Sequence, residues 1–136
     1  MDLDVSKSVL VVDDSSTMIR LVCGMLQQIG FQDIETAQGG NTALAKLKTH
    51  HRDLMISDLH MEPMSGLDLL LALRGDSTHL DMPFIMMTTT SWTKKVVEAR
   101  IAGANNYILK PFDVLALKNK IMAVFAENAG LASAQA

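Results

Sequence analysis

Several apolar segments of this sequence end on a side chain that could take part in metal or phosphoryl chemistry. The residues at these ends are Asp13, Asp14, Asp58, Thr88 and Lys110. If the segments are parallel strands of one open α/β sheet, their carboxyl ends form the edge at which such sheets bind ligands. Asp58 is the central candidate, because it ends an apolar run and precedes a loop that contains Pro63 and Gly66.

The three carboxylates would repel one another in an empty site, so we expect them to attract a hard divalent cation with oxygen ligands. Magnesium fits a site that keeps water molecules and accepts a phosphoryl oxygen. Asp13 and Asp58 are the expected direct ligands, and Asp14 would bind the ion directly or through water. The Asp58 carboxylate could then accept a phosphoryl group, whose oxygens Lys110 and Thr88 would stabilise.

The elements that would position these residues alternate along the chain as strand and helix. Apolar runs and turn residues predict strands at 8–12, 34–37, 54–58, 84–88 and 107–109. Helical periodicity predicts one helix after each strand. This order predicts a doubly wound α/β fold, in which helices cover both faces of a parallel sheet. We expect one domain over residues 1–126 and a disordered tail over 127–136, which lacks periodicity.

The composition is that of a small globular protein. Of the 136 residues, 49% are hydrophobic and 20% are charged, which suits one domain with a single core. No apolar run approaches the roughly 18 residues of a membrane helix, and the acidic N-terminus differs from a secretory signal. We therefore expect a cytoplasmic protein without membrane insertion. The net charge of −3 and the lack of a basic stripe disfavour direct binding of nucleic acid.

Two adjacent histidines, His50 and His51, follow the second predicted helix. Paired histidines can bind transition metals, but no carboxylate or thiol accompanies them at ligand spacing. We therefore interpret them as solvated residues, which suit the negative C-terminal end of a helix. The lone Cys23 falls at an apolar helix position and is interpreted as a buried, inert thiol.

Four short motifs together resemble the receiver domains of two-component response regulators. They are Val-Val-Asp-Asp-Ser-Ser-Thr-Met at 11–18, Ser-Asp-Leu-His-Met at 57–61, Thr88, and Lys-Pro-Phe at 110–112. Each motif alone is weak, but their order and spacing match the family over residues 7–126. The chain looks most similar to the single-domain receivers of chemotaxis, because nearly all of it is receiver and Tyr107 precedes Lys110 by three residues. The resemblance implies a flavodoxin-like three-layer (βα)5 sandwich with strand order 2-1-3-4-5.

The resemblance also implies how the site works. A sensor histidine kinase would phosphorylate Asp58 with Mg²⁺ bound, and the backbone carbonyl of His60 would join the metal ligands. The protein would catalyse its own phosphorylation and dephosphorylation rather than a metabolic reaction. Thr88 would move toward the phosphoryl group and Tyr107 would turn inward, which would remodel the face of the fourth helix, fifth strand and fifth helix. That face would bind a downstream partner, such as the flagellar switch, and the protein would be a monomer.

Three positions near the expected site depart from the family pattern. His60 stands where chemotaxis receivers often carry asparagine, and Thr90 stands in place of an acidic residue. Both positions flank the phosphoryl group and influence the access of water, so we expect autodephosphorylation to differ from the fast chemotaxis type. Thr89 occupies a position where the family prefers alanine or glycine, and we expect its extra atoms to slow small phosphodonors.

Two other functions stay open from the sequence. A haloacid-dehalogenase-type phosphatase also uses an aspartate after a strand, but its second aspartate would stand where this chain has His60. The other is a receiver outside motor control: a phosphorelay intermediate, a phosphate sink, or a regulator of a kinase or adaptor. The alanine-containing tail could also begin a linker, which would make the chain an excised receiver of a longer regulator.

Overall fold

A computed structural model describes residues 3–89 and 94–135, without the side chains of Lys95 and of 128–135. The strands are β1 (Val9–Val12), β2 (Ile34–Ala37), β3 (Leu54–Asp58), β4 (Phe84–Thr88) and β5 (Asn106–Leu109). The helices are α1 (Ser16–Ile29), α2 (Gly40–Thr49), α3 (Gly66–Arg74), α4 (Lys94–Ala102) and α5 (Val114–Gln135). The predicted alternation of strand and helix is therefore confirmed, with strand boundaries that agree to within one residue.

The strands form one parallel sheet in the order β2-β1-β3-β4-β5. This is the predicted doubly wound order. The chain starts at β1, adds β2 on one side and then returns to place β3 on the other side. The sheet edge between the carboxyl ends of β1 and β3 is therefore a switch point, where open α/β sheets bind their ligands. Val12 pairs with Ser57 in register, so the residues that follow β1 lie beside Asp58.

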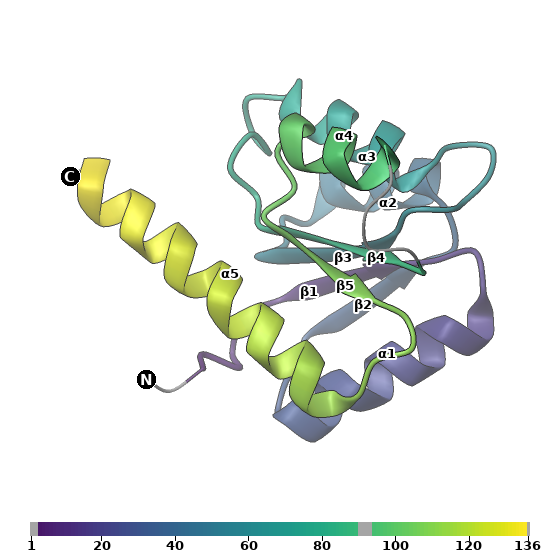
Figure 1. The fold of residues 1–136 in the computed structure, drawn as a ribbon, viewed down its shortest axis with the longest axis horizontal. Coiled ribbons are helices and arrows are strands. Elements are labelled where there is room, and N and C mark those ends of the chain that lie inside the picture. Colours follow the sequence, from purple (N-terminus) through teal and green to yellow (C-terminus); the bar gives the residue numbers. More distant parts are fainter. Residues whose placement is uncertain (1–2, 90–93, 136) are drawn as a thin grey trace.

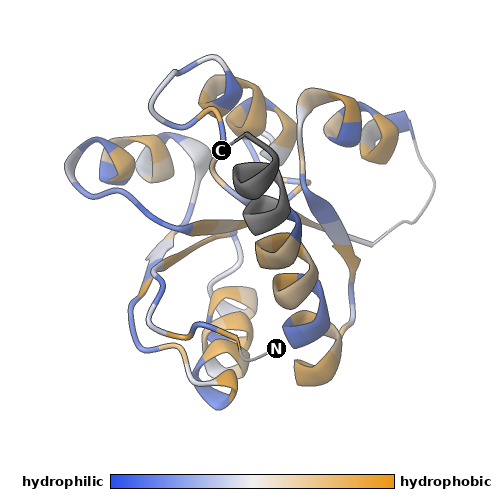
Figure 2. Cartoon of the chain, turned by 90° about the vertical axis from the view of Figure 1, so that its left-hand side faces the viewer, coloured by the Kyte–Doolittle hydropathy of each residue, from blue (hydrophilic) through white to orange (hydrophobic). Residues whose placement is uncertain are grey.

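The helices form two layers, one on each face of the sheet (Figures 1 and 2). α2, α3 and α4 cover one face, and α1 and α5 cover the other. Alternate strand residues supply the two cores: in β1, Leu10 and Val12 belong to the first core, and Val9 and Val11 to the second. β1, β3 and β4 are buried along their whole length, which agrees with their continuous apolar runs.

Capping residues fix where α1 and α3 begin beside the sheet. The Ser15 hydroxyl accepts the backbone N–H of Met18 at the start of α1. Ser65 and Asp68 form a capping box at the start of α3, in which each side chain accepts the backbone N–H of the other residue. Both helices therefore start close to the strand ends, α1 directly after β1 and α3 after the loop that follows β3.

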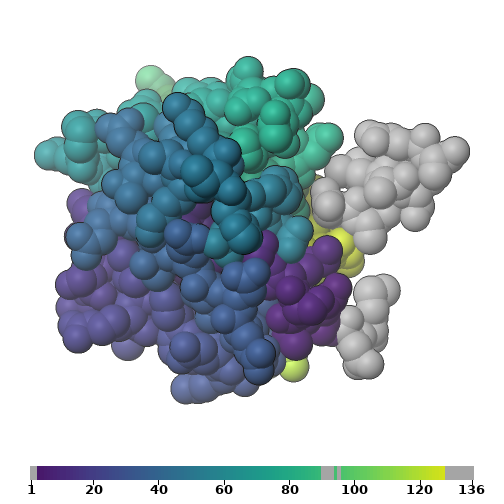
Figure 3. Space-filling view, turned by 180° about the vertical axis from the view of Figure 1, so that it is seen from behind, coloured from purple at the N-terminus to yellow at the C-terminus, as the bar shows by residue number. Residues whose placement is uncertain are grey.

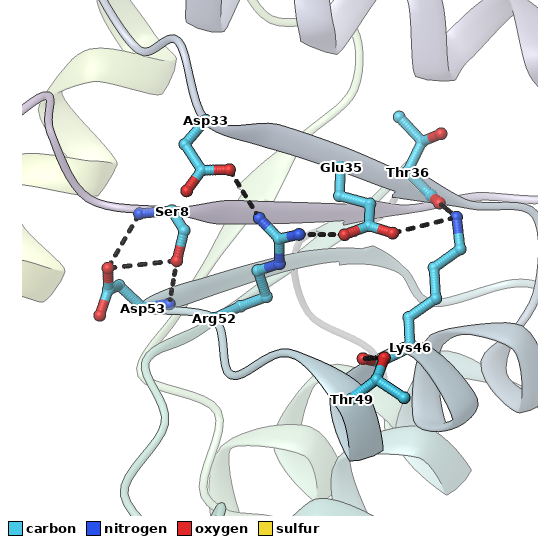
Figure 4. Close-up of polar contacts among 8 residues, drawn as sticks. All are labelled: Ser8, Asp33, Glu35, Thr36, Lys46, Thr49, Arg52 and Asp53. Carbon is cyan, nitrogen blue, oxygen red and sulfur yellow. Dashed lines mark hydrogen bonds and ion pairs between the residues drawn. The ribbon is translucent and has the colours of Figure 1, made fainter.

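A chain of ion pairs lies at β2 (Figure 4). The buried guanidinium of Arg52 lies between Asp33 and Glu35 and pairs with both carboxylates. Glu35 also pairs with Lys46 of α2, at 3.5 Å, and the Lys46 ammonium donates to the backbone carbonyl of Thr36. Neutralising charges thus accompany the burial of Arg52, as burial of a cation requires.

Helix α5 is longer than the sequence indicated. We expected residues 127–136 to form a disordered tail, but α5 continues as helix to Gln135. The expectation relied on apolar periodicity, whereas the alanines of this segment favour helix by intrinsic propensity. The end of α5 projects beyond the sheet in Figure 1. The N-terminal segment lies beside α5 (Figure 3), with the Lys7 ammonium 5.6 Å from the centre of the Phe125 ring.

Within residues 3–89 and 94–135, no helix combines the length and apolarity that crossing a membrane requires.

Candidate functional site

The three predicted carboxylates meet at the carboxyl ends of β1 and β3. Asp13 and Asp14 follow β1, Asp58 ends β3, and one carboxylate oxygen of each lies within 4.8 Å of the others. Asp13 and Asp58 are buried, whereas Asp14 is exposed. The site therefore has a closed inner side made by two carboxylates and an outer side that is open to water.

Lys110 supplies a positive charge to this cluster from the end of β5. Its ammonium nitrogen lies 2.6 Å from Oδ1 of Asp58 and 3.4 Å from Oδ2 of Asp13. The backbone N–H of Lys110 donates to the carbonyl of Thr88, at 2.7 Å, which ties the end of β5 to the end of β4. Thr88 is fully buried at the last position of β4. The sheet thus brings together the residues predicted from four strand ends.

Asp13 is held in place by the start of α1. Its Oδ1 accepts the backbone N–H of Ser15 at 2.9 Å, a local turn that aspartate side chains commonly make two residues ahead of themselves. Burial raises the pKa of Asp13 above its ordinary value, and the charge of Asp58 adds to this effect, while the Ser15 N–H and Lys110 oppose it. The protein alone therefore does not fully compensate the negative charge of the ionised Asp13 carboxylate.

This donor set fits a hard divalent cation. Carboxylate oxygens with access to water are the ligands that magnesium prefers, because the ion keeps several of its water molecules in proteins. Burial disfavours the ionised form of Asp13, and the charge of a divalent cation would offset this effect. Asp13 and Asp58 would hold such an ion from the inner side, and Asp14 from the exposed side. The role of the His60 backbone carbonyl as a further ligand stays a prediction, and the His60 side chain is exposed.

One feature at Asp58 was missed in the sequence, namely the close approach of α3 to its backbone. A Cβ added to Gly66 would lie 2.2 Å from the Asp58 carbonyl oxygen and 2.8 Å from the Met86 sulfur. The Gly66 N–H also donates to the Leu59 carbonyl at 2.9 Å. Only glycine fits this first position of α3. A glycine directly after the capping residue Ser65 was the available signal, but from the sequence we placed Gly66 only in the loop that follows Asp58.

Tyr107 and the predicted tuning residues lie around this centre in different environments. Tyr107 is half-buried on β5, with the Lys120 ammonium 5.2 Å from the centre of its ring, and lines a small hollow together with Val96 of α4. Thr89 is exposed directly after β4. Thr90 lies outside the described residues. The assignment of Thr88 and Tyr107 as a switch stays a prediction.

Comparison with known sequences gives a consistent result. A sequence profile described as the response regulator receiver domain matches residues 9–122. The chemotaxis protein CheY of Pseudomonas aeruginosa is 38% identical over 117 residues, which are 86% of this chain and 94% of the relative. The chemotaxis protein CheY1 of Helicobacter pylori is 42% identical over 120 residues, which are 88% of this chain and 97% of the relative.

Solved structures extend the likeness to three dimensions. The chemotaxis response regulator CheY4 of Vibrio cholerae matches with a TM-score of 0.82 and 34% identity, covering 88% of this chain and 98% of that one. A signal receiver domain of a histidine kinase from Syntrophus aciditrophicus matches with a TM-score of 0.81 and 29% identity, covering 90% of this chain and 92% of that one.

Proposed function

Because the chain belongs to the response regulator receiver family, we propose that it accepts a phosphoryl group from a histidine kinase on Asp58, in the presence of Mg²⁺. The observation that carries this proposal is the meeting of Asp13, Asp14 and Asp58 within 4.8 Å, with the Lys110 ammonium 2.6 Å from Asp58. The phosphorylated protein would then bind a downstream partner with changed affinity.

Each residue of the site has a role in this transfer. A carboxylate oxygen of Asp58 forms a bond to phosphorus while the bond from phosphorus to the donor nitrogen breaks, which leaves an aspartyl phosphate. Magnesium, when bound, neutralises charge on the phosphoryl oxygens. Lys110 pairs with the Asp58 carboxylate before the reaction and is close enough to pair with a phosphoryl oxygen afterwards. The Thr88 hydroxyl, at the adjacent strand end, would donate to another of these oxygens.

The proposed output surface is formed by α4, β5 and α5. A phosphoryl group adds between one and two negative charges at the end of β3. Movement of Thr88 toward that charge would allow Tyr107 to turn inward, into the hollow beneath Val96. We expect a partner in chemotaxis, such as the flagellar switch, because the curated relatives are named chemotaxis proteins. The protein would act in the cytoplasm as a monomer, with the kinase as its upstream partner.

The proposal is tested by amide NMR spectra of the wild type and of Asp58→Asn, each with Mg²⁺ alone and with Mg²⁺ plus beryllofluoride, a mimic of the phosphoryl group. We expect the mimic to shift resonances from Asp58 through Thr88 to Tyr107 and α4 in the wild type, and none of them in the variant. Shifts caused by Mg²⁺ at the acidic cluster without any response to the mimic would contradict a phosphoryl switch. Such a result would indicate a receiver that binds its partner constitutively.

A further inference from the structure

A second group of polar side chains lies at the opposite edge of the sheet, where the strands begin. His79, in the loop between α3 and β4, is buried, and its Nδ1 lies 3.2 Å from Oδ2 of Asp76. Its other ring nitrogen, Nε2, is buried and has no hydrogen-bond partner among the described residues. A buried polar atom without a partner destabilises the folded protein, so its presence calls for an explanation.

Asp76 determines which ring nitrogen of His79 carries the proton. The pKa of Asp76 lies below its ordinary value because its carboxylate accepts the backbone N–H of Thr78 and pairs with His79, so Asp76 is ionised at neutral pH. An ionised carboxylate only accepts hydrogen bonds, and the neutral imidazole must therefore carry its proton on Nδ1. The lone pair then lies on Nε2. Histidines that bind metal ions have this arrangement, in which a carboxylate orients the ring through the other nitrogen.

His51 supplies a second imidazole next to His79. The two ring centres are 5.9 Å apart, and the ring planes differ by 19°. Two imidazoles bound to one zinc ion at ordinary bond lengths have ring centres roughly 5–6 Å apart. The two rings here have a similar separation but are stacked, so their nitrogens do not yet point at a common position. His51 is exposed, and rotation of its side chain can direct a nitrogen toward Nε2 of His79. The sequence showed no ligand partner for His51, and the fold places His79, from the loop between α3 and β4, next to it.

Charged side chains of both signs lie next to His79. Arg74 lies close, since its guanidinium donates to the His79 carbonyl, and it also donates to the Gly103 carbonyl and the Asn105 side chain. Burial lowers the pKa of Arg74, and the charge of Asp81 opposes this effect. Asp76 adds a negative charge at 3.2 Å from His79.

We propose that His51 and His79 bind one divalent transition metal ion of the zinc class, with Asp76 orienting His79 and water completing the coordination. Imidazole suits zinc, nickel and copper, whereas magnesium prefers oxygen ligands, so this site and the acidic cluster select different ions. A bound ion joins the loop before β3 to the loop before β4, at the edge of the sheet opposite Asp58. The site does not depend on phosphorylation.

The test is calorimetric titration of the untagged protein with zinc chloride near neutral pH, with excess Mg²⁺ to occupy the acidic cluster. We expect one equivalent of zinc to bind to the wild type. His51→Ala should weaken binding at least tenfold, and Asp76→Asn by about tenfold, as expected for loss of an orienting carboxylate. His50→Ala is the matched control, because it removes the adjacent exposed histidine, and it should bind zinc as the wild type does.

Nitrogen NMR of the imidazole rings gives a second readout that does not require a variant of the buried His79. Zinc should shift the resonance of Nε2 of His79 together with that of His51. Equal zinc affinity in the wild type and His51→Ala would overturn the proposal, and so would a wild type that binds no zinc. The same conclusion would follow if the resonance of Nε2 of His79 did not respond to zinc.

Discussion

The ammonium nitrogen of Lys110 lies 2.6 Å from Oδ1 of Asp58 and forms an ion pair with it across the ends of β5 and β3. The same nitrogen lies 3.4 Å from Asp13. Lys110 therefore supplies positive charge to the carboxylates that we expect to bind magnesium, and it competes with the metal ion for them. A change at Lys110 should affect the stability of the metal-free protein and its affinity for magnesium in opposite directions.

Replacing Lys110 by methionine should lower the free energy of unfolding of the metal-free protein by about 1–2 kcal/mol, because buried carboxylates lose their partner. This is less than for a fully buried pair, since the lysine side chain is 19% exposed. Magnesium affinity should rise several-fold because the competing cation is gone. Urea unfolding and calorimetric titration measure the two effects, with the exposed Lys118→Met as the control. Unchanged magnesium affinity would show that Lys110 does not compete with the ion.

Asp13→Asn should stabilise the metal-free protein at neutral pH. Burial is the main cause that raises the pKa of Asp13 in the folded protein above its ordinary value of 3.8. The folded state therefore loses stability relative to the unfolded state as the pH rises from below 3.8 through the raised pKa. The asparagine cannot ionise and still accepts the Ser15 N–H. We expect the free energy of unfolding to rise at neutral pH, because the variant avoids the cost of keeping a buried carboxyl ionised.

The gain from Asp13→Asn should shrink below pH 3.8, where the carboxyl is protonated in both states. Magnesium should stabilise the wild type more than the variant, which lacks one carboxylate ligand. Urea unfolding with a chelator and with magnesium, at acidic and neutral pH, separates these effects. An Asp13→Asn variant less stable than the wild type at neutral pH without metal would show that the buried charge is already compensated.

The convergence of Asp58, Thr88 and Lys110 was predictable from sequence because parallel strands place their carboxyl ends at one edge. Each of these residues follows or ends a recognisable apolar run, so its place in the sheet determines its place in the site. Asp13 was predictable for the same reason. The turn that fixes its carboxylate on the Ser15 N–H is local and also had a sequence signal, an aspartate at the junction of a strand and a helix.

Other features depend on contacts between residues that are distant in sequence. Nothing near Arg52 in the sequence shows that its guanidinium will lie between Asp33 and Glu35. His51 and His79 likewise come together only because β3 and β4 are neighbours. The tail was misjudged for another reason: periodicity detects helices that pack on a core, whereas the extension of α5 to Gln135 has helix-forming alanines without an apolar stripe.

Thr89→Ala should accelerate phosphorylation of Asp58 by a small phosphodonor several-fold. Thr89 is exposed directly after β4, so removing its hydroxyl and methyl groups would widen the approach to Asp58 without loss of core packing. The initial rate with a small acyl phosphate and Mg²⁺, followed by mass spectrometry of the intact protein, measures this effect. Thr78→Ala, at an exposed threonine in the loop before β4, is the control. Equal initial rates in the wild type and Thr89→Ala would refute the access role.

Two glycine substitutions of the same chemical size should have opposite effects on stability. In Gly66→Ala, the new methyl group would lie 2.2 Å from the Asp58 carbonyl oxygen, a backbone atom that cannot move without displacing the end of β3. We expect the free energy of unfolding to fall by roughly 2–3 kcal/mol, as for other overpacked sites, and magnesium affinity to fall with it because Asp58 moves.

Gly24→Ala is the matched control within α1. A Cβ at Gly24 would have no neighbour within 4 Å, so the substitution should stabilise the protein by about 0.5–1 kcal/mol through helix propensity alone. Urea unfolding of both variants, with and without Mg²⁺, gives the comparison. A Gly66→Ala protein as stable as the wild type would mean that α3 can shift away from β3, and the position of Asp58 would then not depend on the close approach of this glycine.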